Sequence, residues 1–294
     1  MKGKEMSASE QNNYIVRDHD CDALGHLYTG NYLRFAEDAA HAFWQRVSSS
    51  YGGGEDLIRA WAPAQTVIDL HRPLVAADRF VIQTELAGNT LGQLHLVHTF
   101  MQAEGDAPAA ICQTRWVAAE DVNAEAERVA QTVRELLREA DPVPTWHPAP
   151  AASSPPEGKV EMQRRVGWRD VSPRGRVFTA AYMDYMVDSA ILAGDSFGWN
   201  FQASLEAGFA FVARRQWIEM LSPAGLGDTL RIQTWLYRMR RTTAYRTYIL
   251  TRMLDEEVVA RGCTYWAAVD FDTGRPIRIP EVFLIDLAKH IASD

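Results

Sequence analysis

The sequence is poor in cysteine, in excess positive charge and in long apolar runs. Its three cysteines, Cys21, Cys112 and Cys263, are odd in number and far apart, which argues against a disulfide framework or a zinc cluster. The formal net charge of −8 argues against nucleic-acid binding, which needs a basic surface. No run approaches the roughly 18 apolar residues that span a bilayer, and no signal-peptide core is present. We therefore expect a cytoplasmic protein with no membrane or nucleic-acid partner.

What the sequence does contain is an internal repeat, displaced by 150 positions and aligned without a gap. A proline- and alanine-rich segment separates the two copies. We predict a flexible N-terminal tail over residues 1–13, repeat 1 over 14–140, a linker over 141–157 and repeat 2 over 158–294. The matched pairs include Asp20 and Asp170, Gly25 and Gly175, Tyr32 and Tyr182, Pro73 and Pro223, Asp78 and Asp228, and Trp116 and Trp266.

Each copy has the pattern of one helix followed by several strands. In repeat 1, apolar residues at helical spacing predict a helix over 29–48, with Thr29 as its N-cap. Short connections between the strand-like segments favour antiparallel neighbours. This pattern predicts an α+β fold in which each repeat is a curved antiparallel sheet wrapped around a central helix. Strands are expected at 65–70, 78–86, 94–102 and 110–119, and at 215–221, 228–237, 244–254 and 258–271, with closing helices near 124–140 and 280–292.

The segment "DCDALGHLYTGNYLRFAED", residues 20–38, resembles the hotdog-fold thioesterases, and the 4-hydroxybenzoyl-CoA thioesterase branch most of all. Both copies share the resemblance, which implies a tandem, or double, hotdog. In that family two units pair with their helices side by side, so the resemblance implies an intramolecular pseudo-dimer and leaves a further homodimer open. The spacing of Asp22 and His26 departs from the pattern of the dehydratase branch. The residues that fall on the thioesterase motif are Asp22, Gly25, Asn31, Tyr32 and Glu37.

The two copies differ at the polar positions of this motif. Because Ser172 replaces Asp22 in repeat 2, the turn does not require a carboxylate there, and we expect Asp22 to act as a nucleophile or as a general base. For His26, Asn31 and Glu37, a catalytic role and a role as a helix-capping or solvent-exposed residue are alternatives. Repeat 2 keeps none of these groups. The candidate catalytic residues are Asp22, His26, Asn31 and Glu37, and their counterparts are Ser172, Arg176, Ala181 and Val187.

The start of the predicted helix offers a second chemical element. Backbone N–H groups near Thr29 and Gly30 lack intrahelical partners and could polarise a thioester carbonyl. Asp20 occurs in both copies, so we interpret it as a structural residue that binds backbone in the turn. A metal site built from His19, Asp20, Asp22 and His26 fits no known ligand spacing. We therefore predict no metal, and no cofactor apart from the CoA of the substrate.

Repeat 2 contributes arginines where repeat 1 has none. In the aryl-CoA thioesterases that the chain resembles, two arginines and a hydroxyl residue contact CoA phosphates, and Arg240, Arg241 and Thr243 fall at that point. The planar guanidinium suits phosphate. The alternative is a solvated hairpin, shared with Arg246 and Arg252. The resemblance thus implies a division of labour, with chemistry from repeat 1, CoA binding from repeat 2 and one composite site per chain.

The sequence therefore predicts a thioesterase that hydrolyses an acyl-CoA or aryl-CoA. An acyl-carrier-protein thioesterase and a non-catalytic acyl-CoA-binding protein remain as alternatives. Trp116 and Trp266 are matched between the repeats and are expected to pack in the core. The unmatched tryptophans are candidates to line an acyl or aryl pocket, and they are Trp44, Trp61, Trp199 and Trp235.

Overall fold

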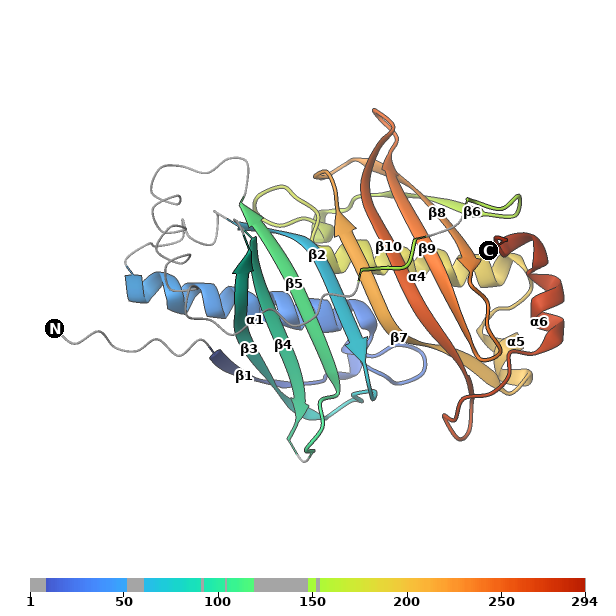
Figure 1. The fold of residues 1–294 in the computed structure, drawn as a ribbon, viewed down its shortest axis with the longest axis horizontal. Helices are drawn as coiled ribbons and strands as arrows, with labels where there is room; N and C mark the ends of the chain where they lie inside the picture. Colours follow the sequence, from blue (N-terminus) through green and yellow to red (C-terminus); the bar gives the residue numbers. More distant parts are fainter. Residues whose placement is uncertain are drawn as a thin grey trace. The chain divides into compact units, whose positions relative to one another are not determined.

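The computed structural model describes residues 9–51, 61–90, 93–103, 105–118, 148–151 and 154–293. The chain divides into two compact units, Met1–His147 and Pro148–Asp294 (Figure 1). The helix predicted over 124–140 lies outside the described residues. None of the helices in the described ranges is long and apolar enough to cross a membrane.

Unit 1 is an antiparallel sheet with one long helix against it. The strand order is β1-β3-β4-β5-β2, and α1 packs on β1, β3 and β4. The predicted helix is confirmed and continues three residues further than expected, to Tyr51. The elements are β1 (Ser9–Ile15), the short 3₁₀ helix η1 (Asp18–Asp20), α1 (Thr29–Tyr51), β2 (Trp61–Leu70), β3 (Arg79–Thr90), β4 (Gln93–Gln102) and β5 (Ala110–Ala118).

The prediction of a flexible tail over residues 1–13 is wrong for residues 9–13, which lie in strand β1. Residues 9–13 form most of this strand, which pairs antiparallel with β3 from Ser9 opposite Glu85 to Ile15 opposite Arg79. The sequence SEQNNYI carries few apolar residues because β1 is the edge strand of this unit and buries none of its side chains fully. The alternation of apolar and polar residues that marks a strand is therefore too weak to read here.

Unit 2 repeats the architecture of unit 1. Its strand order is β7-β10-β9-β8-β6, and α4 packs on β6, β7 and β8. Figure 1 shows the same arrangement in each unit, a long helix lying along one face of a curved sheet. The elements are β6 (Val160–Arg165), η3 (Trp168–Asp170), α4 (Thr179–Ser196), α5 (Phe201–Glu206), β7 (Phe209–Met220), β8 (Thr229–Tyr237), β9 (Thr243–Arg252), β10 (Glu257–Asp270), α6 (Glu281–Asp286) and η4 (Ala288–His290). The α+β tandem hotdog predicted from the sequence is confirmed.

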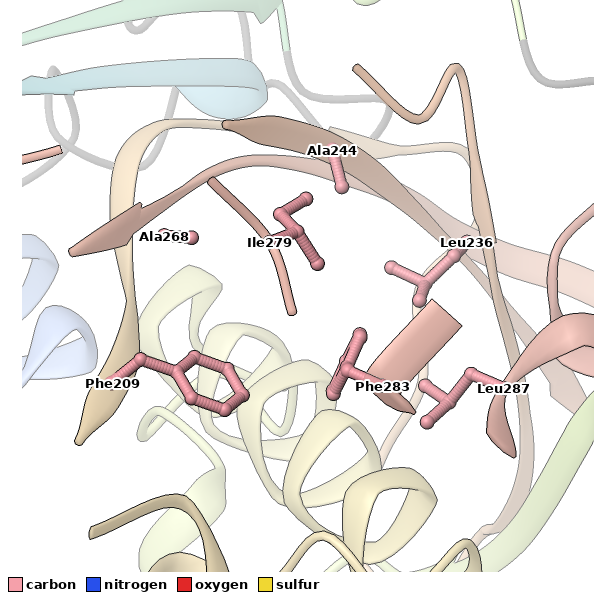
Figure 2. Packing of buried hydrophobic residues seen from close by; sticks show 7 residues of the cluster. All are labelled: Phe209, Leu236, Ala244, Ala268, Ile279, Phe283 and Leu287. Atoms are coloured by element: carbon pink, nitrogen blue, oxygen red, sulfur yellow. The ribbon is translucent and has the colours of Figure 1, made fainter. Parts of the chain in front are cut away.

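The C-terminal helix predicted over 280–292 is present only as two short pieces, α6 and η4. The break lets the end of the chain join the sheet, since the Ala292 N–H donates to the Leu236 carbonyl at 2.8 Å. Those backbone groups could not serve both a helix and a strand. An apolar cluster under this segment fixes it to unit 2 (Figure 2), and its members are Phe209, Leu236, Ala244, Ala268, Ile279, Phe283 and Leu287.

Candidate active site

The polar residues that the repeats share hold backbone in both units. Asp20 Oδ2 accepts the Arg17 N–H at 2.9 Å, and Asp170 Oδ2 accepts the Gly167 N–H at 2.7 Å. This confirms the structural interpretation of Asp20. Tyr32 of the family motif behaves in the same way, since its hydroxyl accepts the Leu74 N–H at 3.1 Å. Burial raises the pKa of Tyr32 to about 12, so its hydroxyl stays protonated at neutral pH.

Asp22 begins the tight turn that precedes α1. Its N–H donates to the His26 carbonyl at 2.8 Å, and Gly25 adopts the left-handed φ of 76° that the turn requires. Asp22 Oδ1 accepts the N–H groups of Leu24 at 2.9 Å and His26 at 3.1 Å. Within the described part of the chain, no hydrogen bond reaches Oδ2. The half-buried carboxylate is therefore held in one orientation by one oxygen, and the other oxygen is available to a water or a substrate.

Unit 2 forms the same turn without a carboxylate. The Ser172 N–H donates to the Arg176 carbonyl at 2.8 Å, the Gly175 N–H donates to the Ser172 carbonyl at 2.8 Å, and Gly175 has a φ of 75°. These contacts match those of Asp22, His26 and Gly25. The backbone of the turn thus forms with either side chain, and the carboxylate of Asp22 is not a requirement of the fold.

The helix that follows the turn presents unused N–H groups. The Tyr28 carbonyl accepts the N–H groups of Asn31 at 2.8 Å and Tyr32 at 3.3 Å, so the N-cap position is Tyr28 and the prediction of Thr29 was wrong by one residue. Among the described residues, no acceptor lies opposite the N–H groups of Thr29 and Gly30. Such groups carry the positive end of the helix dipole and can stabilise a developing oxyanion.

Asn31 connects this helix end to the turn. Its Nδ2 donates to the Asp20 carbonyl at 2.9 Å, and its Oδ1 accepts from Arg34 at 3.0 Å. Since the Tyr28 N–H also donates to the Asp20 carbonyl, at 2.9 Å, one carbonyl joins the acidic segment to α1. Asn31 is therefore placed to position the turn. Repeat 2 keeps the corresponding backbone contact from Phe178 to Asp170 without an amide side chain.

The two remaining candidate catalytic residues of unit 1 are His26 and Glu37, and only His26 belongs to the turn. His26 is half-buried and forms an isolated β-bridge with Val75. Glu37 lies on α1, where its charge contributes to the environment of the buried Cys112 on β5. Burial is the main cause that raises the pKa of Cys112, to about 12, and the charge of Glu37 raises it further. Thus His26 belongs to the turn, whereas Glu37 lies further along the helix and close to the sheet.

Arg240 and Arg241 lie in the loop of the β8–β9 hairpin, between the two strands. The Arg240 N–H donates to the carbonyl of Thr243, the first residue of β9, at 2.8 Å. The Arg241 carbonyl accepts the Ile279 N–H at 2.9 Å, which fixes the hairpin against the C-terminal segment. Both side chains are exposed, and neither forms an ion pair with a described residue. The hairpin therefore presents two guanidinium groups that an anion can reach.

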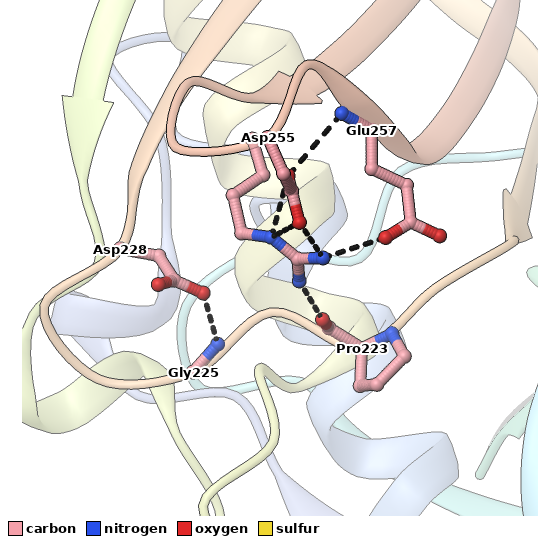
Figure 3. A network of polar contacts seen from close by, with 6 residues as sticks. Pro223, Gly225, Asp228, Asp255 and Glu257 are labelled. Atoms are coloured by element: carbon pink, nitrogen blue, oxygen red, sulfur yellow. Dashed lines mark hydrogen bonds and ion pairs between the residues drawn. The ribbon is translucent and has the colours of Figure 1, made fainter.

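The other two arginines of this region are not solvated hairpin residues. Arg252 binds the carboxylates of Asp255 at 2.7 Å and Glu257 at 2.6 Å, and its Nη1 donates to the Pro223 carbonyl at 2.6 Å (Figure 3). This network fixes the loop in which Asp228 accepts the Gly225 N–H at 2.8 Å. Arg246 is buried inside unit 2.

Three of the unmatched tryptophans lie in the cores of the units. Trp44, Trp61 and Trp235 are each almost fully buried, and Trp116 packs edge-on against Trp44 with a ring separation of 6.3 Å. Trp199 packs on the apolar cluster of unit 2 and donates from Nε1 to a carboxylate of α6 at 3.1 Å. Within the described residues, no group of three or more His, Cys, Asp or Glu side chains is placed to hold a metal ion.

Comparison with known protein families decides the assignment. The family described as the thioesterase-like superfamily matches residues 16–145 and 166–287, one match in each repeat. The chain belongs to this superfamily. Its enzyme class is accordingly that of the thioester hydrolases, and the resemblance of residues 20–38 to hotdog thioesterases is confirmed. No curated protein sequence matches the chain.

Solved structures support the double-hotdog fold across the length of the chain. A protein from Lactobacillus plantarum described as an oleoyl thioesterase has a TM-score of 0.70 at 15% identity, over 95% of this chain and 100% of its own. The 12:0-ACP thioesterase of Umbellularia californica has a TM-score of 0.69 at 10% identity, over 89% and 94% of the two chains. An acyl-ACP thioesterase of Bacteroides thetaiotaomicron has a TM-score of 0.63 at 14% identity, over 89% and 100%.

Proposed function

We propose that the protein hydrolyses the thioester of an acyl-CoA or aryl-CoA, with the chemistry supplied by the turn and helix start of unit 1. The observation that carries this proposal is the turn that both units build alike, with Asp22 in unit 1 and Ser172 in unit 2. A residue that the backbone does not need, and that leaves one carboxylate oxygen uncommitted, is placed for chemistry. Thioester hydrolysis needs such a group together with a polarised carbonyl.

The substrate carbonyl oxygen would accept hydrogen bonds from the N–H groups of Thr29 and Gly30. Asp22 Oδ2 would either remove a proton from a water that attacks the carbonyl carbon or attack that carbon itself. The water route gives a tetrahedral oxyanion, which collapses with loss of the CoA thiolate. The direct route gives a mixed anhydride between Asp22 and the acyl group with loss of the CoA thiolate, and water then hydrolyses the anhydride. His26, Asn31 and Glu37 would orient the water or the turn.

The nucleotide would bind at the β8–β9 hairpin of unit 2. Arg240 and Arg241 are exposed there without ion pairs among the described residues, and Thr243 adds a hydroxyl. Charge-assisted contacts from arginine to phosphate are among the stronger hydrogen bonds in proteins. Because only unit 1 has the acid–base groups, we expect one catalytic site per chain. Titration with a non-hydrolysable acyl-CoA analogue would contradict this if it gave two equivalent tight sites.

The test is the release of free thiol from a panel of aliphatic and aromatic acyl-CoAs by the wild type and by Asp22→Asn. Asparagine keeps the Oδ1 acceptor of the turn and removes the base, so we expect a folded variant that has lost most of the activity. Ser172→Ala is the matched control and should retain it. Activity that survives Asp22→Asn would contradict the role of Asp22. Binding of CoA esters without any hydrolysis would favour the non-catalytic binding protein.

A second candidate is an acyl-carrier-protein thioesterase. It is favoured by two of the full-length structural likenesses, which are described as acyl-ACP thioesterases. Both substrates present the acyl group on phosphopantetheine, and they differ in what lies beyond it. Competition between an acyl-CoA and the same acyl group on a carrier protein would separate the candidates, since the true substrate should inhibit turnover of the other at a far lower concentration.

A further inference from the structure

Unit 2 carries an arginine on the inner face of its sheet. Tyr248 of β9 lies opposite Gly262 of β10, and a side chain at Gly262 would collide with Met186 of α4. This face of the sheet is therefore the one that α4 covers. Arg246 lies two residues from Tyr248 on the same strand, hence on the same face. Its side chain is 6% exposed.

Neither hydrogen-bond partner of this guanidinium carries a negative charge. Arg246 Nη1 lies 3.3 Å from Thr234 Oγ1 and 2.8 Å from His290 Nε2. His290 Nδ1 lies 2.9 Å from the Gly158 carbonyl, which can only accept, so Nδ1 carries the proton and Nε2 is an acceptor. Burial and the charge of Arg246 lower the pKa of His290 to about 4, in agreement with a neutral ring.

No carboxylate among the described residues forms an ion pair with Arg246, so within that part of the chain its charge is buried without a counter-ion. An unpaired buried charge is costly, of the order of several kcal/mol. The hotdog sheet does not need a charged residue at this position. The matched position of repeat 1 is Leu96, which is fully buried on β4. As at the turn of Asp22, one repeat has a charged group where the other shows that the fold accepts a neutral one.

The polar groups around Arg246 have unused hydrogen-bonding capacity. Gln216 is 1% exposed and donates to Thr264 Oγ1 at 3.4 Å, yet its Oε1 has no donor among the described residues. Thr264 lies directly opposite Arg246 in the β9–β10 pairing.

The same positions in unit 1 satisfy each other. Thr66 and Thr114 correspond to Gln216 and Thr264, and their hydroxyl groups lie 3.3 Å apart. The unsatisfied amide oxygen of Gln216 is thus a property of unit 2, and Thr264, to which Gln216 donates, lies opposite the position at which unit 2 has gained a charge.

We propose that the inner face of unit 2 is a binding site for a monocarboxylate whose oxygens accept hydrogen bonds from the guanidinium of Arg246. One buried positive charge is matched by one negative charge, and the planar guanidinium fork is complementary to a planar carboxylate. Leu236, the residue opposite Arg246 on β8, and Ala244 belong to the apolar cluster of Figure 2, so the surroundings suit an acid with an apolar body. The acid released by thioester hydrolysis is of this class, an identification that rests on the proposed function.

The test is calorimetry and thermal unfolding of the full chain with hexanoate, hexanol or chloride at constant ionic strength. Hexanoate should bind and raise the unfolding temperature, and neither hexanol nor chloride should match it. Arg246→Leu, which installs the residue of repeat 1, should fold and bind hexanoate at least about tenfold more weakly. Arg246→Lys keeps the charge without the fork and should bind with intermediate affinity. Arg261→Leu removes an exposed arginine of β10 and is the matched control.

Three results would overturn the proposal: an equal response to hexanol, an equal response to chloride, or unchanged hexanoate binding by Arg246→Leu. If Arg246→Leu did not fold, unchanged hexanoate binding by Arg246→Lys would have the same meaning. The readout involves no turnover, so it can fail while thiol release succeeds. Repeating it with Asp22→Asn separates the two further, since that substitution should abolish hydrolysis and leave hexanoate binding at Arg246 unchanged.

Discussion

The two repeats use their shared polar residues alike and their unshared ones differently. Asp20 and Asp170 each accept a backbone N–H three residues earlier in the chain, and Asp78 and Asp228 do the same for the loop before β3 and β8. These residues maintain the fold. At positions where the repeats diverge, such as Asp22 in unit 1 and its counterpart Ser172 in unit 2, the backbone is the same and the side-chain chemistry differs.

The inner faces of the two sheets show the same rule in the core. Unit 1 places His98 beside Thr84, with His98 Nδ1 3.0 Å from the Thr84 hydroxyl. Unit 2 has Tyr248 at the position of His98 and adds Arg246 where unit 1 is aliphatic. A tandem repeat is thus its own control, because each unit shows which side chains the other could do without.

The largest expected effect comes from making repeat 1 resemble repeat 2 at the turn. Asp22→Ser should lower kcat/KM for thiol release by about 10²- to 10⁴-fold, because it removes the proposed base or nucleophile. The fold should persist, since Ser172 supports the same turn. Steady-state kinetics measures kcat/KM, and circular dichroism shows whether the variant keeps the fold. Adding the reciprocal substitution Ser172→Asp to that variant should restore no activity. A loss of kcat/KM smaller than about tenfold in Asp22→Ser would contradict the view that the two repeats differ in catalytic chemistry at this position.

The second effect is on stability and depends on pH. The pKa of His290 is lowered to about 4 in the folded state, mainly by burial, so the unfolded state binds more protons between about pH 4 and 6.5. The stabilisation is complete above about pH 6.5 and is lost as the pH falls, by about 2 kcal/mol at pH 5. His290→Gln can donate to Gly158 and accept from Arg246 without titrating, so its free energy of unfolding should depend less on pH.

Urea unfolding at pH 7.5 and at pH 5 measures this difference. His41→Gln, at an exposed histidine of α1, is the control and should keep the pH dependence of the wild type. Equal pH dependence in His290→Gln and the wild type would mean that His290 does not contribute as a buried neutral ring.

The third effect concerns the arginines that only repeat 2 carries at its hairpin. Arg240→Gln and Arg241→Gln should each raise KM for acyl-CoA about tenfold and leave kcat nearly unchanged, as expected for lost charge-assisted contacts to phosphate. A pantetheine thioester of the same acid lacks the nucleotide, so its KM should not respond. Arg261→Gln removes an exposed arginine of the same unit and should alter neither. A response with both substrates would place the arginines outside nucleotide binding.

Periodicity was sufficient to predict α1 and the central strands of unit 1, because α1, β3 and β5 each bury one regular face. It failed where burial does not set the pattern. Strand β1 is a polar edge strand, and residues 9–13 read as tail. Arg246 reads as one more hairpin arginine, because only the pairing of β9 with β8 and β10 reveals that its side chain points toward α4.

At the candidate site, too, the sequence was sufficient for some residues and not for others. The comparison of the copies predicted the structural role of Asp20 and selected Asp22 as a candidate catalytic residue, since a substitution within the repeat is visible in one sequence. The contact of Asn31 with the Asp20 carbonyl joins residues eleven positions apart, and it needs the turn and the helix to be in place.

The smallest expected effect tests the shared residues. Asp78→Ala and Asp228→Ala each leave a backbone N–H of the preceding loop without its acceptor, at Val75 and Gly225 respectively. Each should lower the free energy of unfolding by about 1 kcal/mol, by a similar amount in the two repeats, and leave kcat/KM within about twofold of the wild type. Urea unfolding and thiol release measure the two quantities. If Asp78→Ala reduced activity as strongly as Asp22→Ser while Asp228→Ala did not, then a shared residue would carry chemistry in one repeat alone, and matching between the copies would no longer separate fold from function.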